Sequence, residues 1–365
     1  MTAPCIVMAT GGTGGHIYPA LAVGQVLKEW GYNVVLLGQQ GGMEARLAPE
    51  AGFNFHGVSA GKFDRQRPDP RQAYRALRGL NQARRIVKAL SPAVVVGYGG
   101  FASFPGVAAA AWLRLPLVLH EQNAIPGLVT RWFARRAAVV AVSNREVSAH
   151  LPAGVRVEHV GYPIREARLT KAAAKARLGL PETGPVTLVM GGSQGSLVLN
   201  RLVPAAYRRL TVPPIVIHSS GARWEAEVRQ ATADLPHYYV QPYLDAPTAW
   251  SVADLAITRA GFGTLAEAAF HGVPLVMIPL ASAAEDHQHH NAVAVERAGA
   301  GLLVRQSEAE RDIATLVSAW QGLLDEPRRR QASAQALQRS PQGAAEALAG
   351  VIQQLIASKP AWEQI

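Results

Sequence analysis

A glycine-rich run that ends in a histidine is the first feature of this sequence with chemical potential. The apolar segment Cys5–Thr10 leads into GGTGGH at residues 11–16, and the helical pattern IYPALAVGQVLKEW follows. Glycines between a strand and a helix let backbone amides and the helix N-terminus approach a phosphate group. Close packing of the helix on the strand would explain the same glycines, so this loop alone leaves both interpretations open.

A second glycine loop lies 180 positions further along the chain. The apolar segment Val186–Met190 leads into GGSQGS at residues 191–196, and another helical pattern follows. Neither loop matches a common nucleotide motif: His16 and Ile17 replace the Lys-Ser/Thr pair of a Walker loop, and no acidic residue directly follows Leu37. Two such loops in register nevertheless favour a site for a nucleotide diphosphate.

His16 stands at the start of the helix that follows the first loop. The positive end of a helix disfavours an imidazolium ion, so the ring is expected to be neutral and able to accept a proton near pH 7. A histidine here could instead hydrogen-bond a backbone carbonyl. A catalytic base and this structural role are both consistent with the residues.

Two further polar clusters follow segments with the pattern of buried strands. The four polar residues 120–123 (HEQN) come directly after an apolar run, and packing alone does not account for them. The second cluster, RAGFGTLAE at residues 259–267, places a glycine turn before a carboxylate on the first turns of a helix. Glu267 is therefore a candidate ligand for the two hydroxyls of a ribose, although an acidic residue near a helix N-terminus also favours the helix itself.

The segment DHQHHN at residues 286–291 contains three histidines and invites comparison with a metal site. Histidines at positions i, i+2 and i+3 of a helix do not all point in one direction, and no cysteine or second acidic cluster lies nearby. Gln288 and Asn291 are better suited to hydrogen-bonding a sugar. We expect neither a metal ion nor a cofactor.

These clusters require a scaffold that brings strand ends together. Short apolar runs without polar alternation recur in both halves, as in parallel strands covered on both faces, and helical patterns separate them. The sequence therefore predicts two α/β domains with parallel sheets, joined by a linker at Gly161–Leu169. Ligands bind beyond the carboxyl ends of such strands, so we expect both glycine loops to border one cleft. The predicted strands are Cys5–Thr10, Val34–Leu37, Ala93–Val96, Leu117–His120, Val139–Val142, Val186–Met190, Ile215–His218, Tyr238–Val240, Leu255–Thr258 and Leu275–Ile278.

Length and composition agree with this plan. A chain of 365 residues is long enough for two domains, and 49% hydrophobic with 17% charged residues excludes a disordered or coiled-coil protein. The single cysteine, Cys5, permits no internal disulfide and fits a reducing compartment. We expect no targeting segment and no membrane-spanning helix, because the uncharged stretch Ala89–Leu113 is interrupted by glycines and prolines.

The net charge of +10 is concentrated in one segment. Residues 1–164 carry +9 and residues 165–365 carry +1, while Lys62–Lys88 alone carries +7. The sequence predicts a helix over residues 71–90 with an apolar face and a basic face. A basic amphipathic helix is typical of contact with anionic lipid headgroups, although a solvated outer helix of an α/β domain shows the same pattern. Nucleic acid is disfavoured because no binding motif accompanies the charge. The apolar face comprises Ala73, Leu77, Leu80, Val87 and Leu90, and the basic face Arg71, Arg75, Arg78 and Arg85.

Six motifs, taken in order, resemble those of the MurG family, bacterial transferases that add N-acetylglucosamine (GlcNAc) from UDP-GlcNAc to lipid I in peptidoglycan synthesis. The resemblance extends from about residue 5 to about residue 350, through GGTGGH, HEQNAIPG, GYPIR, GGSQGS, RAGFGTLAE and DHQHHNA. It implies the GT-B fold, with two Rossmann-like domains of doubly wound parallel sheets facing a cleft. The implied domains are residues 1–163 on the acceptor and membrane side and residues 164–343 on the donor side. Residues 344–365 would form a helix that returns to the first domain.

The resemblance also implies roles for single residues. His16 corresponds to the histidine proposed as general base or diphosphate ligand, and Asn123 to a residue that closes on GlcNAc. Tyr162 and Phe262 depart from the family pattern, which usually has Asn and a small residue there, so the fine geometry of the donor site is in question. The other implied contacts are Thr13, Gly14 and Gly15 near the diphosphate and acceptor, Arg165 and Ser193 near the uracil and phosphates, Leu244 at the uracil, Phe262, Gly263, Thr264, Leu265, Ala266 and Glu267 at the diphosphate and ribose, and Gln288 at the sugar hydroxyls.

The implied reaction is an inverting, metal-independent transfer of GlcNAc to the 4-hydroxyl of MurNAc in undecaprenyl-pyrophosphoryl-MurNAc-pentapeptide (lipid I), which gives lipid II. The enzyme would act as a peripheral protein on the cytoplasmic face of the bacterial cell membrane. Three alternatives stay open: a GT-B transferase that glycosylates another lipid such as diacylglycerol, a UDP-GlcNAc 2-epimerase, and a nucleotide-sugar-binding protein without activity.

Overall fold

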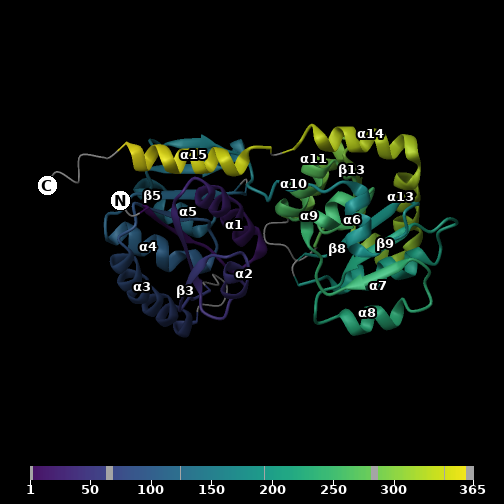
Figure 1. Ribbon diagram of the computed structural model, residues 1–365, viewed down its shortest axis with the longest axis horizontal. Coiled ribbons are helices and arrows are strands. Elements are labelled where there is room, and N and C mark those ends of the chain that lie inside the picture. Colours follow the sequence, from purple (N-terminus) through teal and green to yellow (C-terminus); the bar gives the residue numbers. More distant parts are fainter. Residues whose placement is uncertain are drawn as a thin grey trace. The chain divides into compact units, whose positions relative to one another are not determined.

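The computed structural model describes residues 3–62, 69–123, 125–192, 194–280, 287–340 and 342–358, without the side chain of His287. The chain divides into two compact units, Met1–Arg165 with Gly343–Ile365, and Glu166–Gln342 (Figure 1). Each unit contains one parallel sheet with helices on its faces, which is a Rossmann-like arrangement. Two such units in one chain make up the GT-B fold that the sequence predicts.

In the first unit, seven described strands pair in the order β3-β2-β1-β4-β5-β6-β7, and every pairing is parallel. The reversal of strand order beside β1 brings the ends of β1 and β4 together, the place where doubly wound sheets bind ligands. The strands are β1 (Cys5–Ala9), β2 (Asn33–Gln39), β3 (Asn54–Val58), β4 (Val94–Gly97), β5 (Leu117–Glu121), β6 (Val139–Val142) and β7 (Val157–His159). The helices are α1 (Gly14–Glu29), α2 (Glu44–Glu50), α3 (Pro70–Leu90), α4 (Phe104–Trp112), α5 (Leu128–Phe133) and α15 (Ala344–Ala357), with 3₁₀ turns at Phe101–Ser103, Ala134–Arg136 and Arg145–His150.

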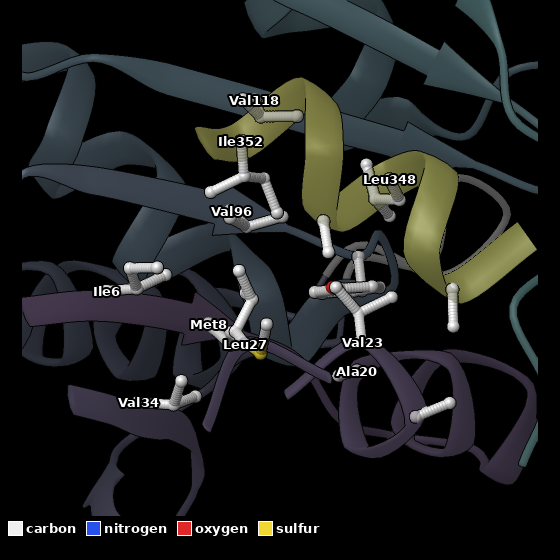
Figure 2. Packing of buried hydrophobic residues seen from close by; sticks show 14 of the residues in the cluster. Ile6, Met8, Ala20, Val23, Leu27, Val34, Val96, Val118, Leu348 and Ile352 are labelled. Carbon is white, nitrogen blue, oxygen red and sulfur yellow. The ribbon is translucent and has the colours of Figure 1, made fainter. Parts of the chain in front are cut away.

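Alternate residues of β1 build two separate cores. Ile6 and Met8 pack with α1 and α15, whereas Val7 and Ala9 pack with α3, α4 and α5. Figure 2 shows Leu348 and Ile352 of α15 lying against strand residues of this unit. The predicted helix at residues 344–357 thus returns to the first unit, and its buried side chains are part of that unit's core.

In the second unit, six described strands pair in the order β10-β9-β8-β11-β12-β13, again all parallel. Helices α6, α9, α10 and α11 cover one face, and α7, α12 and α13 cover the other. The strands are β8 (Val186–Met190), β9 (Ile215–Ser219), β10 (Tyr238–Gln241), β11 (Leu255–Thr258), β12 (Leu275–Met277) and β13 (Gly301–Leu303). The helices are α6 (Lys171–Leu178), α7 (Leu197–Tyr207), α8 (Glu225–Ala231), α9 (Ala246–Val252), α10 (Phe262–His271), α11 (His287–Arg297), α12 (Gln306–Arg311), α13 (Ile313–Leu324) and α14 (Glu326–Leu337).

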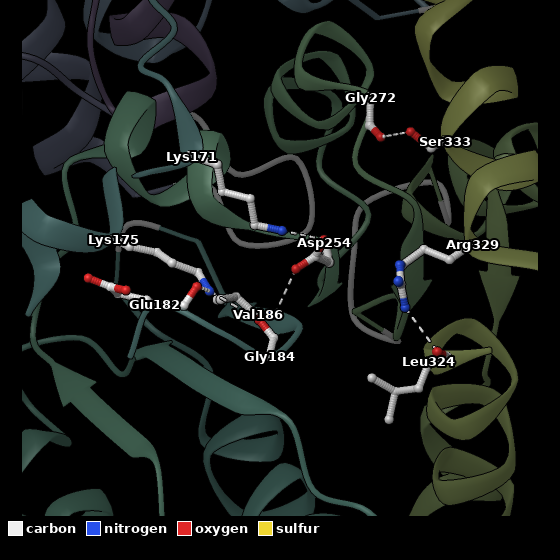
Figure 3. A network of polar contacts seen from close by, with 10 residues as sticks. All are labelled: Lys171, Lys175, Glu182, Gly184, Val186, Asp254, Gly272, Leu324, Arg329 and Ser333. Atoms are coloured by element: carbon white, nitrogen blue, oxygen red, sulfur yellow. Dashed lines mark hydrogen bonds and ion pairs between the residues drawn. The ribbon is translucent and has the colours of Figure 1, made fainter. Parts of the chain in front are cut away.

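Polar contacts fasten α6, the first helix of the second unit, to the start of β8. Asp254 accepts a hydrogen bond from the Val186 backbone amide at 2.8 Å and forms an ion pair with Lys171 (Figure 3). Lys175 donates to the carbonyl oxygens of Glu182 and Gly184 at 2.8 and 3.1 Å. These bonds satisfy a buried ammonium group and fix the segment that leads into the second glycine loop.

Three strands were not predicted: β3, β7 and β13. All three lie at sheet edges, where one side of the strand makes no ladder hydrogen bonds. Their sequences, NFHGV, VEH and GLL, are short and lack the continuous apolar run of a buried central strand. Two predicted ends were one residue too long, because Thr10 and Ile278 lie beyond the last ladder pairs of their strands.

The predicted apolar face of α3 is wrong for Ala73 and Leu77, which are exposed. The buried face consists mainly of small residues: Ala76, Gly79, Ala83 and Val87. A methyl group on Gly79 would lie 1.7 Å from the carbonyl oxygen of Ser59, so the helix backbone packs directly on that segment. This close approach rotates the helix away from the face that hydrophobicity favours. Among the described residues, no helix is long and apolar enough to cross a membrane.

Candidate functional site

The candidate site of the first unit surrounds His16, in the first turn of α1. Thr13 is the N-cap residue, and its Oγ1 lies 2.8 Å from Nδ1 of His16. The ring lies against the backbone of Gly99 and Gly100, where Cβ atoms would approach it to 3.3 and 3.2 Å. Burial lowers the pKa of His16 to about 4, so the ring is neutral at pH 7. Helix α1 begins at Gly14, so Gly14 and Gly15, which were predicted to lie in the loop, belong to its first turn.

A second histidine, His120, lies close to this loop and is buried at the end of β5. His120 Nε2 is 3.0 Å from Oγ of Ser143, and that hydroxyl donates to the carbonyl oxygen of Gly161 at 2.8 Å. The hydroxyl has only one hydrogen, so His120 donates from Nε2 and its Nδ1 is the unprotonated nitrogen. Burial is the main cause that lowers the pKa of His120 to about 4; the Gly161 backbone acts in the opposite direction, and the charge of His16 acts in the same direction as burial.

The rings of Tyr98 and Tyr162 both contact the ring of His120. The ring centroid of Tyr98 is 5.6 Å from that of His120, and the ring centroid of Tyr162 is 6.4 Å from that of His120. Tyr162 donates from its hydroxyl to the carbonyl oxygen of Gly15 at 3.0 Å. This departure from the family pattern therefore fastens the first turn of α1, a role within the first unit.

Asn123 is held by the neighbouring Glu121. The Glu121 carboxylate accepts from the backbone amide and Nδ2 of Asn123 at 3.1 and 3.0 Å. It also accepts from the Gly127 amide at 2.9 Å and the Thr130 hydroxyl at 2.7 Å. The HEQN cluster thus spans the end of β5 and the residues after it, and Glu121 holds Asn123 there, a role that the sequence pattern did not reveal.

A separate candidate site lies in the second unit, at the ends of β8 and β11. Ser196 caps α7: its Oγ accepts from the Leu199 amide at 3.4 Å and from Nε of Arg259 at 3.1 Å. Arg259 is buried and also donates to the carbonyl oxygens of Ile278 and Pro279 at 2.9 and 3.0 Å. This residue, which the sequence reasoning did not single out, joins the second glycine loop to the end of β12. Ser193 lies outside the described residues.

The predicted ribose and diphosphate contacts form the start of α10. Gly261 is the N-cap, and Phe262, Gly263, Thr264, Leu265, Ala266 and Glu267 follow it. Glu267 accepts a hydrogen bond from Nε1 of Trp250 at 2.9 Å. Burial raises the pKa of Glu267 to about 7, while the Trp250 bond acts in the opposite direction. The positive end of α10 and a carboxyl group near its ionisation point therefore share one helix.

Three other predicted contacts lie around this helix or at the unit boundary. Leu244 packs against the second unit's core in the segment between β10 and α9. Gln288, in the first turn of α11, accepts from the Leu280 amide at 3.0 Å. Arg165 is the last residue assigned to the first unit before the chain enters the second. Each of these three residues is thus placed by contacts or by position within its own unit.

The histidine-rich segment lies at the start of α11. Within the described part of the chain, no three His, Cys, Asp or Glu side chains gather as metal ligands, while Asp286 and the His287 side chain fall outside it. Asn291 donates from Nδ2 to the carbonyl oxygen of Ala260 at 3.1 Å. This bond joins α11 to the turn before α10.

The second glycine loop crosses a neighbouring turn at very short range. A methyl group on Gly195 would lie 1.9 Å from the carbonyl oxygen of Ser220, and Gly195 has a φ of +74°. Gly195→Ala is therefore expected to displace the loop, cost about 1–3 kcal/mol, and speed hydrogen exchange in the peptide spanning residues 190–197. Gly179→Ala is the matched control, because Gly179 has a φ of +64° with open space around it. Equal losses of stability in Gly195→Ala and Gly179→Ala would contradict the expectation that the close contact of Gly195 with Ser220 causes the effect.

Comparisons with known proteins agree with this architecture. Residues 6–142 match the glycosyltransferase family 28 N-terminal domain, and residues 186–349 match the glycosyltransferase family 28 C-terminal domain. The fold and these two domains define a glycosyltransferase.

The relatives narrow this class. The chain is 53% identical to the UDP-N-acetylglucosamine--N-acetylmuramyl-(pentapeptide) pyrophosphoryl-undecaprenol N-acetylglucosamine transferase of Deinococcus radiodurans, over 82% of this chain and 84% of that protein. It is 48% identical to the protein of the same name from Deinococcus deserti, over 96% and 98% of the two chains. The crystal structure of Acinetobacter baumannii MurG matches with a TM-score of 0.73 and 28% identity, over 96% of this chain and 99% of that one. The chain belongs to the MurG family of peptidoglycan-synthesis glycosyltransferases.

Proposed function

We propose that this enzyme transfers GlcNAc from UDP-GlcNAc to the 4-hydroxyl of MurNAc in lipid I, with inversion at the anomeric carbon and without a metal ion. Family membership supports the donor and the acceptor class. The observation that carries the mechanism is His16, a histidine kept neutral by burial, at a glycine loop and beside Thr13. A neutral imidazole is the form that accepts a proton.

In the proposed step, His16 acts as a general base. If Nδ1–H donates to Thr13, the lone pair of Nε2 is available to take the proton of the acceptor hydroxyl. The hydroxyl oxygen attacks C1 of the donor sugar from the face opposite the nucleotide. The bond between C1 and the diphosphate oxygen breaks, and its electron pair leaves with UDP.

The groups proposed to stabilise the leaving diphosphate belong to the second unit. The N-terminus of α10 and the described backbone of the second glycine loop, at Gly191 and Gly192, would offer amide hydrogens to the negative charge. Glu267 would accept hydrogen bonds from the ribose hydroxyls in its ionised form. With these groups, a divalent cation is not required in the proposed mechanism.

A transfer assay with UDP-GlcNAc and a lipid I analogue tests this proposal. We expect a β-linked disaccharide product and unchanged turnover in excess chelator. Loss of activity on chelation would overturn the metal-independent step. Preference for a diacylglycerol acceptor, conversion of UDP-GlcNAc without any acceptor, or binding without turnover would each favour one of the alternative functions.

We also propose that α3 docks the enzyme on an anionic membrane at its cytoplasmic face. Arg71, Arg75, Arg78 and Arg85 are all exposed on this helix. Large apolar side chains accompany them: Tyr74, Leu77 and Trp112 are 67%, 63% and 64% exposed. Arg84 stacks on the Trp112 ring, with its guanidinium 4.5 Å from the ring centroid. Cations next to exposed aromatic and aliphatic groups suit the headgroup region of a bilayer.

Charge reversal on this helix is expected to weaken vesicle binding. Each cation near an anionic surface contributes about 1 kcal/mol, so Arg75→Glu/Arg78→Glu should lower partitioning onto phosphatidylglycerol vesicles at least about 30-fold. Flotation assays that compare binding of each protein to phosphatidylglycerol vesicles and to phosphatidylcholine vesicles measure this effect. The control Arg177→Glu/Arg209→Glu makes the same charge change on exposed positions of the second unit. An equal loss in both variants, or equal binding of wild type to both lipids, would argue against docking through α3.

A further inference from the structure

Glu44 places a fully buried carboxylate beneath the first glycine loop. It is the first residue of α2, and none of its surface is exposed. Its Oε1 accepts a hydrogen bond from the Gln39 backbone amide at 2.7 Å, and Oε2 accepts one from the Gly12 amide at 3.4 Å. One side chain thus joins the end of β2 to the loop that follows β1.

Three glycines leave the space that this carboxylate fills. Methyl groups on Gly11, Gly38 and Gly42 would lie 1.9, 2.6 and 2.6 Å from side-chain atoms of Glu44. The three glycines come from the β1–α1 loop, the end of β2 and the turn before α2. The carboxyl group is thus closely packed against three glycines, and both of its oxygens accept backbone hydrogen bonds.

The Glu44 carboxylate accepts the hydrogen bond of the Gly12 amide, a loop amide of the kind that a dinucleotide-binding domain would offer to its ligand. In such domains the glycine-loop backbone approaches a pyrophosphate, and an acidic residue at the end of the second strand binds a ribose. Here no acidic residue follows β2 directly, and the carboxylate from α2 binds the loop instead. The Gly12 amide is thereby committed to an internal partner.

This bond fixes the backbone that leads to His16. Gly11 and Gly12 have φ values of +140° and +85°. Glycine adopts positive and negative φ values about equally readily, so other contacts must hold the loop in this conformation. Thr13 follows immediately and contacts the His16 ring. We propose that Glu44 is a positioning residue that holds Gly12 and Thr13, and through them His16, in the geometry that proton transfer requires. This inference rests on the proposed role of His16 in GlcNAc transfer.

Glu44→Gln tests the proposal at nearly constant volume. An amide offers one acceptor oxygen in place of two, and its NH₂ group would face a backbone N–H. We expect kcat for transfer to fall at least tenfold, while the KM for UDP-GlcNAc and the affinity for UDP change less than twofold. Hydrogen exchange of the peptide spanning residues 10–17 should become faster. Glu50→Gln is the control, because Glu50 is exposed on the same helix and pairs only with Arg46 among the contacts described here.

A double-mutant cycle separates this role from general stability. The three nearest atoms to a methyl group on Gly42 all belong to the Glu44 carboxyl group, so Gly42→Ala acts by displacing it. We expect Gly42→Ala to lower kcat in the wild-type background and to have less than a twofold effect when Glu44 is already alanine.

The outcomes distinguish the two proposals. If the wild type transfers GlcNAc and the folded Glu44→Gln variant has the same kcat, the role of Glu44 is wrong. Additive effects in the double-mutant cycle would also overturn it. A wild type that transfers nothing to lipid I would instead overturn the proposed function. In that case unchanged hydrogen exchange at residues 10–17 in Glu44→Gln would still refute the loop-holding role.

Discussion

His16→Ala is expected to lower kcat for GlcNAc transfer by a factor on the order of 10²–10⁴, the usual contribution of a general base. The ring is neutral because burial lowers its pKa to about 4, and alanine leaves the acceptor hydroxyl without a proton acceptor. The KM for UDP-GlcNAc should change little, because the predicted ribose and sugar contacts Glu267 and Gln288 belong to the second unit. Steady-state kinetics with each substrate varied separately measure both quantities.

The partner of His16 provides a second test of the same mechanism. Thr13→Val removes the oxygen that lies 2.8 Å from Nδ1, whereas Thr13→Ser retains it. We expect the valine variant to lose activity and the serine variant to keep most of it. Near-normal turnover in His16→Ala, or equal activity of the valine and serine variants, would exclude the base assignment.

Lowering the pH from 7.5 to 5 is expected to destabilise the first unit by about 4 kcal/mol. Burial lowers the pKa of both His16 and His120 to about 4, from an unfolded value near 6.5. A lowered folded-state pKa gives stability that is present above pH 6.5 and is lost as the pH falls toward 4. Each histidine then contributes about 2 kcal/mol to the loss at pH 5, because the unfolded chain binds protons that the folded chain does not.

The second unit should respond less, because opposing groups titrate there. Burial lowers the pKa of His218 to about 3 and that of His271 to about 4, which destabilises the unit in acid. Glu267 acts in the opposite direction: its pKa is raised to about 7, so its contribution to stability is present below pH 4.5 and is lost as the pH rises toward 7. On acidification, the protonation of Glu267 therefore restores part of the stability that the second unit loses through its histidines.

Hydrogen exchange with peptide resolution measures the two units in one experiment. After correction for intrinsic exchange rates, core peptides of the first unit should lose more protection than those of the second. His120→Asn should remove about half of the loss in the first unit, and the control His150→Asn, at an exposed position, should remove none. A His120→Asn protein with the wild-type pH dependence would contradict the prediction.

The sequence by itself determined the class of enzyme and the type of fold. Apolar runs such as Val139–Val142 predicted central strands because both of their faces must be covered, and these strands are confirmed. The two glycine loops and the order of six motifs predicted the MurG family, which the relatives confirm. Local patterns suffice here because the formation of strands, helix starts and glycine turns depends largely on neighbouring residues.

Tertiary structure decided what lies around those residues. The orientation of α3 followed from the contact of Gly79 with Ser59, not from its hydrophobic periodicity, so Leu77 is exposed beside the arginines. Glu44, Glu121 and Arg259 gained their partners only when separate loops met at the strand ends. The low pKa of His16 likewise arises from the protein atoms packed around the ring. A sequence records which groups are available, but burial and hydrogen bonding between distant segments depend on the folded chain.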